Sequence, residues 1–316
     1  MDVLTDVLES VRMRGMVTGR VELGAPWGLR MAKAEHAVFH AITRGTCWLE
    51  IAGEARRGLS SGDLFVLPHG DAHVLRDSPR TRPVPFEELF AQHSTASEQA
   101  ARAGGDGATT TLVCGHFEFE DRRGSPLLCA LPKVIHIRGE EGRAVPWLEP
   151  TLQFVASEAA AGRPGAETVI RRLSDVLFIQ IVRAHIASLQ NGAGGWLSAL
   201  GDPQVGAALG LIHDRPERPW TVASLAAEVA LSRSAFAARF NALVGEPPLH
   251  YVTRWRMQKA ASLLRSGHPA ARSGLAEIAA RVGYESEAAF NKAFKRWFGS
   301  APGANRQSSP TPQKQG

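Results

Sequence analysis

Histidine side chains in the first 120 residues could bind a metal. Imidazole nitrogens are ligands that zinc, copper and iron accept in proteins. The sequence contains no His-x-His pair in this region, and two of its histidines flank a turn at Gly70. The pattern therefore favours no bound metal and no cofactor. If a metal did bind, the residues available to it would be His40, His69, His73 and His116.

Cys114 is a candidate for redox chemistry. It lies in LVCGHF (112–117), and residues two apart on a strand share a face, so His116 is expected beside it. A neighbouring imidazolium lowers the pKa of a thiol and favours the reactive thiolate. Oxidation could stop at a sulfenic acid or form a bond to Cys47 or Cys129. The alternative, which the apolar strand favours, is a buried cysteine with a raised pKa.

Composition and charge restrict the classes of function. The chain has 316 residues, of which 44% are hydrophobic and 21% charged, as in a globular protein of two or three domains. It shows no apolar run of membrane-spanning length and no signal peptide, so we expect a cytoplasmic protein. Residues 219–306 hold twelve Lys and Arg against five Asp and Glu, whereas residues 1–218 are slightly acidic. This asymmetry favours a polyanionic partner for the C-terminal part.

The elements that position these residues fall into a β-rich and a helical part. Four β-rich runs at residues 38–43, 46–52, 63–68 and 110–120 predict a barrel or sandwich within residues 16–135. Residues 79–109 are rich in Pro, Ser, Ala and Gly and predict a flexible insertion. Apolar residues at helical spacing then predict two helices within residues 147–190. The segment QNGAGG (190–195) is typical of a linker.

The helical part contains an internal repeat. TVASLAAEVALSRSAFAARF (221–240) matches GLAEIAARVGYESEAAFNKAF (274–294), with one additional residue, Glu285, in the second turn. Each copy predicts a short helix, a tight turn at Ala230 or Gly283, and a second helix capped by Ser232 or Ser286. Phenylalanines four residues apart face the core in each second helix. Two helix-turn-helix motifs joined by a helix at 249–265 could place two reading helices on successive major grooves.

Residues 203–306 resemble the DNA-binding domain of the AraC/XylS family of transcriptional regulators. The specific segments are AEIAARVGYESEAAFNKAFKRWFGSAPGANR (276–306) and RWRMQKAASLL (254–264). Carried over by position, the resemblance implies that bases are read by Arg233, Ser234, Ala237, Ala238, Glu287, Ala288, Asn291 and Lys292. It implies phosphate contacts from Ser232, Arg239, Arg254, Arg256, Ser286, Lys295 and Arg296.

The N-terminal part resembles the cupin-like sensor domains of one branch of this family, through SGDLFVLPHGDAHVL (61–75). LVCGHF also resembles regulators of that branch that sense reactive chlorine by cysteine oxidation. Those regulators use a second cysteine near the N-terminus, where RVELGAPWGL (20–29) contains none.

The expected fold class is α+β with two domains. Residues 1–195 are predicted to form a cupin-like β-barrel with a helical linker pair, and residues 203–302 an all-α double helix-turn-helix domain. Residues 303–316 are predicted to be a disordered tail. The function expected is a DNA-binding transcription factor controlled by a small molecule or an oxidant. The alternative is a cupin-type metal-dependent enzyme fused to a DNA-binding module.

The partners expected are double-stranded DNA, RNA polymerase and a second copy of the chain. The broad apolar stripe from Val169 to Ile181 must be buried against something, and we favour a second subunit. On this hypothesis, Val176→Asp and Ile181→Asp each give a folded monomer.

Overall fold

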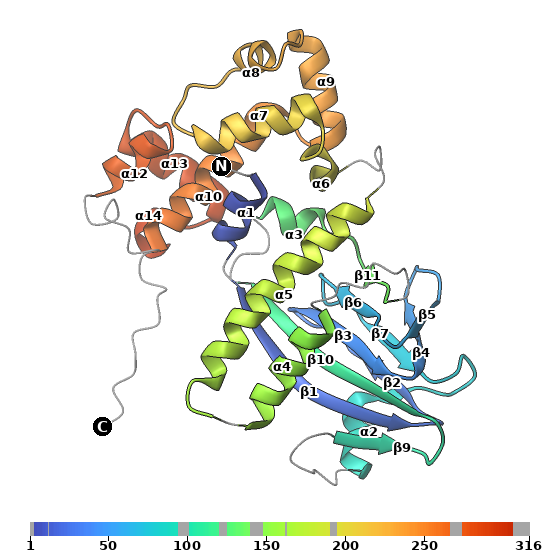
Figure 1. Cartoon of the computed structure of the whole chain (residues 1–316). Helices are drawn as coiled ribbons and strands as arrows, with labels where there is room; N and C mark the ends of the chain where they lie inside the picture. Colours follow the sequence, from blue (N-terminus) through green and yellow to red (C-terminus); the bar gives the residue numbers. More distant parts are fainter. Residues whose placement is uncertain are drawn as a thin grey trace, which may run out of the picture. The chain divides into compact units, whose positions relative to one another are not determined.

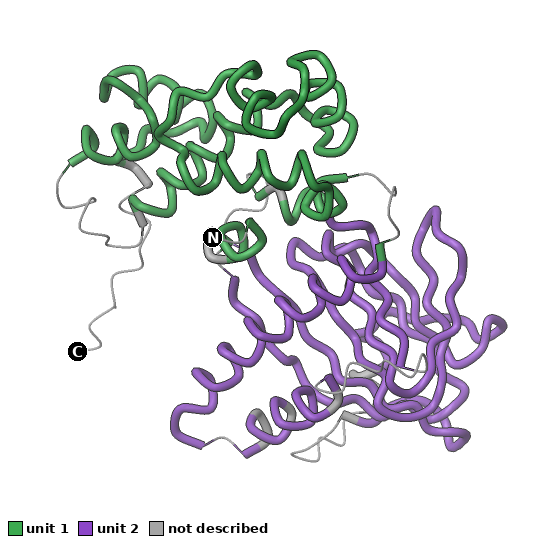
Figure 2. The backbone as a smooth tube through the Cα atoms, turned by 45° about the horizontal axis from the view of Figure 1, so that its top comes forward, with its two compact units in different colours: residues 1–11, 121–130, 189–316 green, residues 12–120, 131–188 purple. Residues whose placement is uncertain are grey.

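The computed structural model describes residues 3–11, 13–93, 101–119, 125–139, 148–161, 163–189, 195–265 and 274–305. The chain divides into two compact units, shown in different colours in Figure 2. Residues 12–120 and 131–188 form the first, here named the barrel unit. Residues 1–11, 121–130 and 189–316 form the second, the helical unit. The helical unit therefore includes residues 1–11 and 121–130, which the expected division into 1–195 and 203–302 assigned to the first domain.

Two β-sheets form the barrel unit (Figure 1). The strand order is β11-β6-β3-β10-β1-β9 in one sheet and β5-β4-β7-β2-β8 in the other. Pairing is antiparallel except between β1 and β9 and between β2 and β8. The strands are β1 (Met13–Gly24), β2 (Gly28–Met31), β3 (Ala37–Arg44), β4 (Thr46–Ile51), β5 (Arg57–Ser60), β6 (Leu64–Leu67), β7 (His73–Arg76), β8 (Val84–Pro85), β9 (Ala101–Gly104), β10 (Thr109–Phe119) and β11 (Ile135–Ile137). All four predicted strand regions are confirmed.

Alternation along β10 decides which of its side chains face the core of the barrel. Leu112 is buried in a cluster contributed by both sheets, and Cys114 packs against that cluster. Phe117, at the opposite parity, stacks on Phe39 at 5.0 Å and contacts Phe178 of the helical pair at 5.4 Å. Because neighbouring side chains on a strand point to opposite faces, one strand both fills the barrel and supports the helices.

The predicted helical pair is α4 (Leu148–Ala161) and α5 (Ala166–Ser188), which pack on each other and on β1. Gly15 of β1 permits the close approach of α5, because a Cβ atom there would lie 2.0 Å from Cβ of Ser174. The predicted apolar stripe is divided by this packing. Ile181 is fully buried within the chain, whereas Val176 remains 47% exposed.

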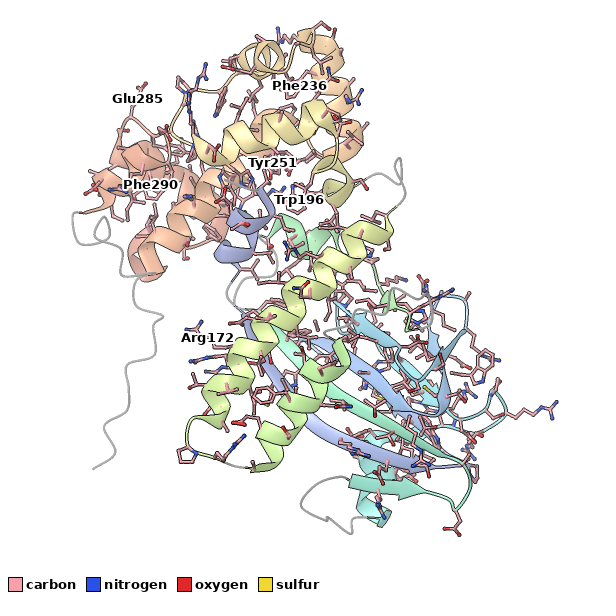
Figure 3. All side chains as sticks on the ribbon, viewed as in Figure 1. Arg172, Trp196, Phe236, Tyr251, Glu285 and Phe290 are labelled. Carbon is pink, nitrogen blue, oxygen red and sulfur yellow. The ribbon has the colours of Figure 1, made fainter. Side chains whose placement is uncertain are left out.

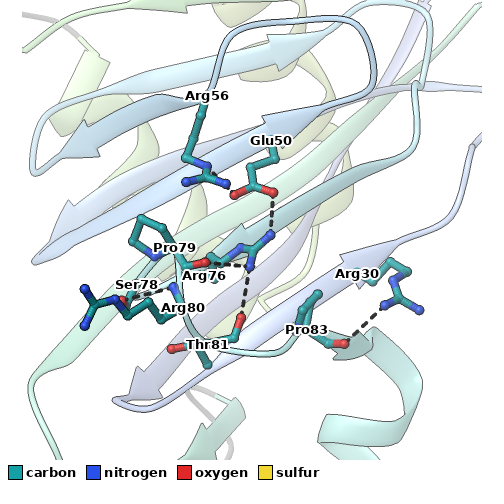
Figure 4. A network of polar contacts seen from close by, with 9 residues as sticks. All are labelled: Arg30, Glu50, Arg56, Arg76, Ser78, Pro79, Arg80, Thr81 and Pro83. Atoms are coloured by element: carbon teal, nitrogen blue, oxygen red, sulfur yellow. Dashed lines mark hydrogen bonds and ion pairs between the residues drawn. The ribbon is translucent and has the colours of Figure 1, made fainter.

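The segment predicted to be a flexible insertion is ordered over most of its length. It contains β8, α2 (Phe86–His93) and β9, while residues 94–100 lie outside the described residues. Arg76 explains part of this order (Figure 4), because its guanidinium donates to the carbonyl oxygens of Pro79 at 3.0 Å and Thr81 at 3.1 Å. The same guanidinium pairs with Glu50. Pro79 and Thr81 lie only three and five residues after Arg76, but Glu50 lies 26 residues before it, so composition alone does not reveal how Arg76 is anchored.

Within its described residues, the helical unit contains α1 (Val3–Ser10), α3 (Pro126–Ala130), α6 (Trp196–Ala199), α7 (Pro203–Asp214), α8 (Val222–Glu228), α9 (Arg233–Val244), α10 (Pro248–Arg265), α12 (Leu275–Arg281), α13 (Glu287–Phe298) and α14 (Pro302–Asn305). Residues 303–305, predicted to begin a disordered tail, thus belong to a helix, and residues 306–316 lie outside the description. No helix among the described residues is long and apolar enough to cross a membrane.

The internal repeat predicted from the sequence is confirmed in detail. Both α9 and α13 have twelve residues and end at a glycine with a left-handed backbone, Gly245 and Gly299. The turns also correspond, because Ala230 and Gly283 have φ values of 55° and 78°. Ser232 and Ser286 accept hydrogen bonds from the N–H groups of Ala235 and Ala289, as expected for N-caps. The same local rules therefore produce two copies of one motif.

Candidate nucleic-acid interface and sensor site

The two second helices of the repeat, α9 and α13, expose one face and bury the other. Phe236 and Phe240 of α9 are fully buried, as are Phe290 and Phe294 of α13, and Figure 3 labels the first phenylalanine of each pair. The buried face of α13 belongs to an apolar cluster that it forms with α10 and α12. The opposite faces are largely exposed, as is Glu285 in the turn that precedes α13.

The residues expected to read bases lie on these outer faces. Arg233, Ser234, Ala238, Glu287, Ala288 and Lys292 are exposed, and Ala237 and Asn291 are half-buried. The Asn291 side chain differs from the expectation in one respect. Its Oδ1 atom is buried and has no hydrogen-bond partner among the described residues. An amide reads adenine through both its oxygen and its NH2 group, so Oδ1 of Asn291 is less accessible for that contact than the exposed side chains of Arg233 and Lys292 are for theirs.

Several residues expected to contact phosphates have protein partners. Arg239 donates to the carboxylate of Asp202, the N-cap of α7, from Nε at 3.3 and 3.1 Å and from Nη2 at 2.6 Å. Arg254 forms an ion pair with Glu246. The largest departure from the expectation is Arg256, whose guanidinium donates to the backbone oxygens of Pro216 and Arg218. Lys295 and Arg296 are exposed on α13, where a phosphate could approach them.

A buried polar chain supports the first helix-turn-helix. Trp196 Nε1 donates to the hydroxyl of Tyr251 at 3.1 Å, and that hydroxyl lies 2.8 Å from Nε2 of His213. Asp6 of α1 lies 3.6 Å from the other nitrogen of His213. Contact with His213 lowers the pKa of Asp6, while burial lowers the pKa of His213. The chain therefore contains an aspartate, a neutral histidine and a tyrosine whose pKa is raised by burial.

This polar chain was not found by sequence reasoning. Its members come from α1, α6, α7 and α10, and Asp6 stands more than 200 residues before His213. The ring of His213 also stacks on Trp255 with 3.7 Å between centroids. The only available sequence signal was a set of polar and aromatic residues within apolar helical stretches.

The barrel unit brings three of the predicted chemical residues together. Cys114 Sγ lies 3.0 Å from Nδ1 of His40, and Nε2 of His40 lies 3.2 Å from Nε2 of His73. The strands explain this proximity, because Cys114 of β10 pairs with His40 of β3. Nδ1 of His73 lies 3.0 Å from the backbone oxygen of Asp71. The arrangement is a continuous line of polar atoms inside the core.

Hydrogen-bond chemistry assigns a direction to this line. A carbonyl oxygen only accepts, so Nδ1 of His73 carries a proton and donates it to Asp71. Neutral His73 then accepts at Nε2 from His40, which leaves Nδ1 of His40 to accept from the thiol of Cys114. Burial lowers the pKa of both histidines and raises the pKa of Cys114 to about 12. All three groups are therefore neutral and mutually satisfied.

The predicted partnership of Cys114 with His116 is wrong in this structure. His116 packs against His36 at 4.4 Å between ring centroids and lies 3.6 Å from Glu118. His69 has a different partner, because its Nε2 atom lies 2.9 Å from the backbone oxygen of Leu131. In the described part of the chain, no three His, Cys, Asp or Glu side chains are arranged to hold a metal ion. The imidazole beside Cys114 belongs instead to His40, 74 residues earlier.

Cys47 and Cys129 differ as disulfide partners for Cys114. Cys47 is buried in the same core cluster against which Cys114 packs, and burial raises its pKa to about 12. Cys129 is exposed and belongs to α3 of the helical unit. Within the barrel unit, Cys47 is therefore the cysteine that could react with an oxidised Cys114.

Two family models cover most of the chain. Residues 2–187 match a model described as Cupin, and residues 225–308 match one described as Helix-turn-helix domain. The first spans α1, α3 and all but the last residue of the barrel unit, and the second begins within α8 and includes α13.

Similar proteins of known name cover the whole length. An AraC-like transcription regulator of Streptomyces lividans is 37% identical over 99% of this chain and 100% of its own length. The HTH-type transcriptional regulator AlkR of Acinetobacter baylyi is 33% identical over 98% and 100%. The RCS-specific HTH-type transcriptional activator RclR of Escherichia coli is 29% identical over 97% and 98%. Among solved structures, the DNA-binding domain of AdpA in complex with a target DNA is 31% identical, covering 33% of this chain and 90% of that chain with a TM-score of 0.30.

Proposed function

Because this chain belongs to the AraC-type transcriptional regulators with an N-terminal cupin domain, we propose that both helix-turn-helix motifs read one operator. These relatives confirm the predicted transcription factor and its α+β two-domain fold. They are regulators rather than enzymes, so the metal-dependent enzyme loses its support. The observation that carries the proposal is the pair of matching helices, α9 and α13, each with a polar face outside and two phenylalanines inside.

The base-reading residues of the proposal are the eight expected from the resemblance. Arg233 and Lys292 suit guanine, Glu287 suits cytosine, and the alanines suit the methyl group of thymine. Lys295 and Arg296 are proposed to hold phosphates, together with the N-terminal ends of α9 and α13 capped by Ser232 and Ser286. A cytoplasmic location and a contact with RNA polymerase are further parts of the proposal.

The test uses the full chain and an operator selected from random duplexes. Lys292→Ala is expected to weaken binding by about 1–3 kcal/mol and to relax preference at one base pair, because a bidentate contact discriminates between bases. Lys295→Ala is the matched control on the same helix. It should weaken all duplexes alike and reduce the slope of log affinity against log salt by about one. Equal affinity of the unmutated protein for every duplex would exclude sequence-specific reading.

We also propose that α4 and α5 form a dimer interface. Phe154 and Val176, on these two helices, are among the few large apolar side chains that the described residues leave exposed, at 49% and 47%. Arg172, labelled in Figure 3, and Asp175 form an ion pair beside Val176. Both signs of charge thus flank the apolar residues, which suits a surface that meets its own copy across a two-fold axis. A second subunit would also raise the effective concentration of reading helices on DNA.

For the signal, we propose that Cys114 reacts with an oxidant, with His40 as the base. With hydrogen peroxide, the thiol sulfur attacks one oxygen and forms a sulfenic acid, while the O–O bond breaks. The thiol proton passes through Nδ1 of His40 to the departing hydroxide, which leaves as water. Because the thiol pKa is raised to about 12, little thiolate exists at neutral pH, and proton removal by His40 must accompany the attack.

This proposal is tested by trapping the sulfenic acid with dimedone and identifying the labelled cysteine by mass spectrometry. The unmutated protein should be labelled at Cys114 after peroxide, and His40→Phe should lower the labelling rate at least tenfold, since the imidazole nitrogen 3.0 Å from the thiol is lost. Cys129→Ala is the matched control and should leave labelling at Cys114 unchanged. If Cys114→Ala still responds to the inducing condition with unchanged target transcription, the thiol is structural and the barrel reads a small molecule.

A further inference from the structure

Arg256 occupies a junction between the two helix-turn-helix motifs. It lies on α10, the helix that connects them. Its Nε atom donates to the oxygen of Pro216 and its Nη2 atom to the oxygen of Arg218, both at 2.8 Å. These two carbonyls belong to the loop between α7 and α8, which leads into the first motif. Arg256 is half-buried there, and burial lowers the pKa of its guanidinium.

The loop that Arg256 contacts is itself tied to the first motif. Arg218 forms an ion pair with Glu228 of α8 at 2.8 Å, and its guanidinium lies 4.4 Å from the ring of Trp220. Trp220 in turn donates to the oxygen of Arg215 at 2.9 Å. The loop that Arg256 contacts is therefore linked to α8, against which α9 packs.

On its other side, Arg256 meets the turn of the second motif. Its guanidinium lies 5.9 Å from the ring centre of Tyr284. A Cβ atom on Gly283 would lie 2.6 Å from Nη2 of Arg256 and 2.8 Å from the oxygen of Glu217. Glycine is thus required at 283 for the turn to approach both groups. Tyr284 continues the contact to Phe290 of α13, at 5.9 Å between ring centres.

From this junction we infer that Arg256 is a positioning residue that fixes the spacing and rotation between the two reading helices. The helix α10 sets how far apart the two motifs lie, and a direct contact between the motifs adds a second restraint on their relative rotation. Arg256, with Gly283 and Glu217, is that contact. The inference rests on the proposed function, because it assumes that both motifs read DNA. It replaces the phosphate contact expected for Arg256 from the sequence.

A positioning role and a phosphate contact for Arg256 predict different affinities for operators with altered spacing. Inserting one base pair between two recognition elements moves them about 3.4 Å apart and rotates them by about a tenth of a turn. A protein with rigidly positioned reading helices must reject such an operator, whereas loosely joined helices adapt to it. A phosphate contact, by contrast, adds affinity to every duplex in a salt-dependent manner.

The experiment measures the affinity of the full chain for the selected operator and for versions with one base pair inserted or deleted between the two elements. Arg256→Lys keeps the charge but cannot bridge the two carbonyls, and Arg256→Met removes both. We expect both variants to reduce the ratio of affinities for correct and altered spacing at least fivefold, with an unchanged salt slope. Lys295→Met is the control and should lower the salt slope while keeping the ratio.

A second variant guards against loss of folding. Gly283→Asn keeps a residue that tolerates positive φ but places a Cβ atom against Arg256, so it should also reduce spacing discrimination. Thermal melting separates such effects from unfolding. A salt slope lowered only by Arg256→Met, with the ratio intact, assigns Arg256 to a phosphate and overturns the inference. An intact ratio and slope in all three variants overturns it too. If the unmutated protein shows no spacing preference at all, the two-motif proposal fails first.

Discussion

The Ile181→Asp variant is expected to prevent folding of the barrel unit, whereas Val176→Asp is expected to give a folded monomer. Ile181 is fully buried, and it lies on α5 beside Leu177 and Phe178. Its replacement removes about 1.5–3 kcal/mol of apolar burial and places a carboxylate in the core at a cost of several kcal/mol more. The sum is comparable with the entire stability of a domain, about 5–15 kcal/mol.

Val176 is the matched position on the same helix, five residues earlier. Its side chain is 47% exposed, so an aspartate there should change the free energy of unfolding by no more than about 0.5 kcal/mol. Circular dichroism and light scattering distinguish the two variants. A folded monomer in both cases would show that the packing of α5 on the sheet does not bury Ile181 in solution. A dimer that survives Val176→Asp and Phe154→Asp would place the interface elsewhere.

Acidification from pH 7 to pH 5 is expected to lower the free energy of unfolding steeply. His40, His73 and His213 are buried, and burial lowers the pKa of each below the ordinary value of 6.5. Below pH 6.5 the unfolded chain takes up protons that the folded chain does not, so stability is lost as the pH falls towards each folded pKa. Each such histidine contributes up to about 1.4 kcal/mol per pH unit in that window.

The measurement is urea unfolding at stepped pH, whose slope against pH gives the number of protons taken up on unfolding. His213→Gln should reduce that slope, because the variant no longer has a histidine that protonates only when unfolded. Loss of the contact with Tyr251 lowers the stability of the variant at every pH. The comparison is therefore between the slopes of the free energy of unfolding against pH, and not between the free energies themselves. A free energy of unfolding that stays constant between pH 7 and pH 5 would contradict the neutral, buried state of these three residues.

The helical half of the protein was predictable from sequence because its determinants are local. Caps such as Ser232, turns at Ala230 and Gly283, and phenylalanines at i and i+4 all act within a few residues of one another. The exposed positions of Arg233 and Lys292 follow from the same periodicity. Their base contacts stay predictions, which the Lys292→Ala variant tests.

Features that depend on distant partners were not predictable in the same way. Strand alternation correctly placed Cys114 and His116 at the same parity but could not supply the pairing of β10 with β3, which brings His40 to the thiol. Arg256 resembled any basic residue on a helix until its acceptors, 38 and 40 residues earlier, were known. Segments 79–93 and 303–305 were misjudged because composition does not register distant contacts, such as the hydrogen bond from Arg30 to the oxygen of Pro83 or the packing of α14 on α10 and α13.

The winding of the chain between its two units limits how such a regulator can be rebuilt. The backbone passes from one unit to the other near residues 11, 120, 130 and 188, so α1 and α3 are encoded upstream of the linker but complete the helical unit. Val7 of α1 is fully buried there, and Asp6 stands beside His213. A chimera that joins a foreign sensor at residues 190–195 would discard both helices and open an apolar surface. When sensors are exchanged between relatives, the N-terminal helix and the segment after β10 should therefore be kept from the protein that supplies the DNA-binding half. This holds although both segments precede the linker in the sequence.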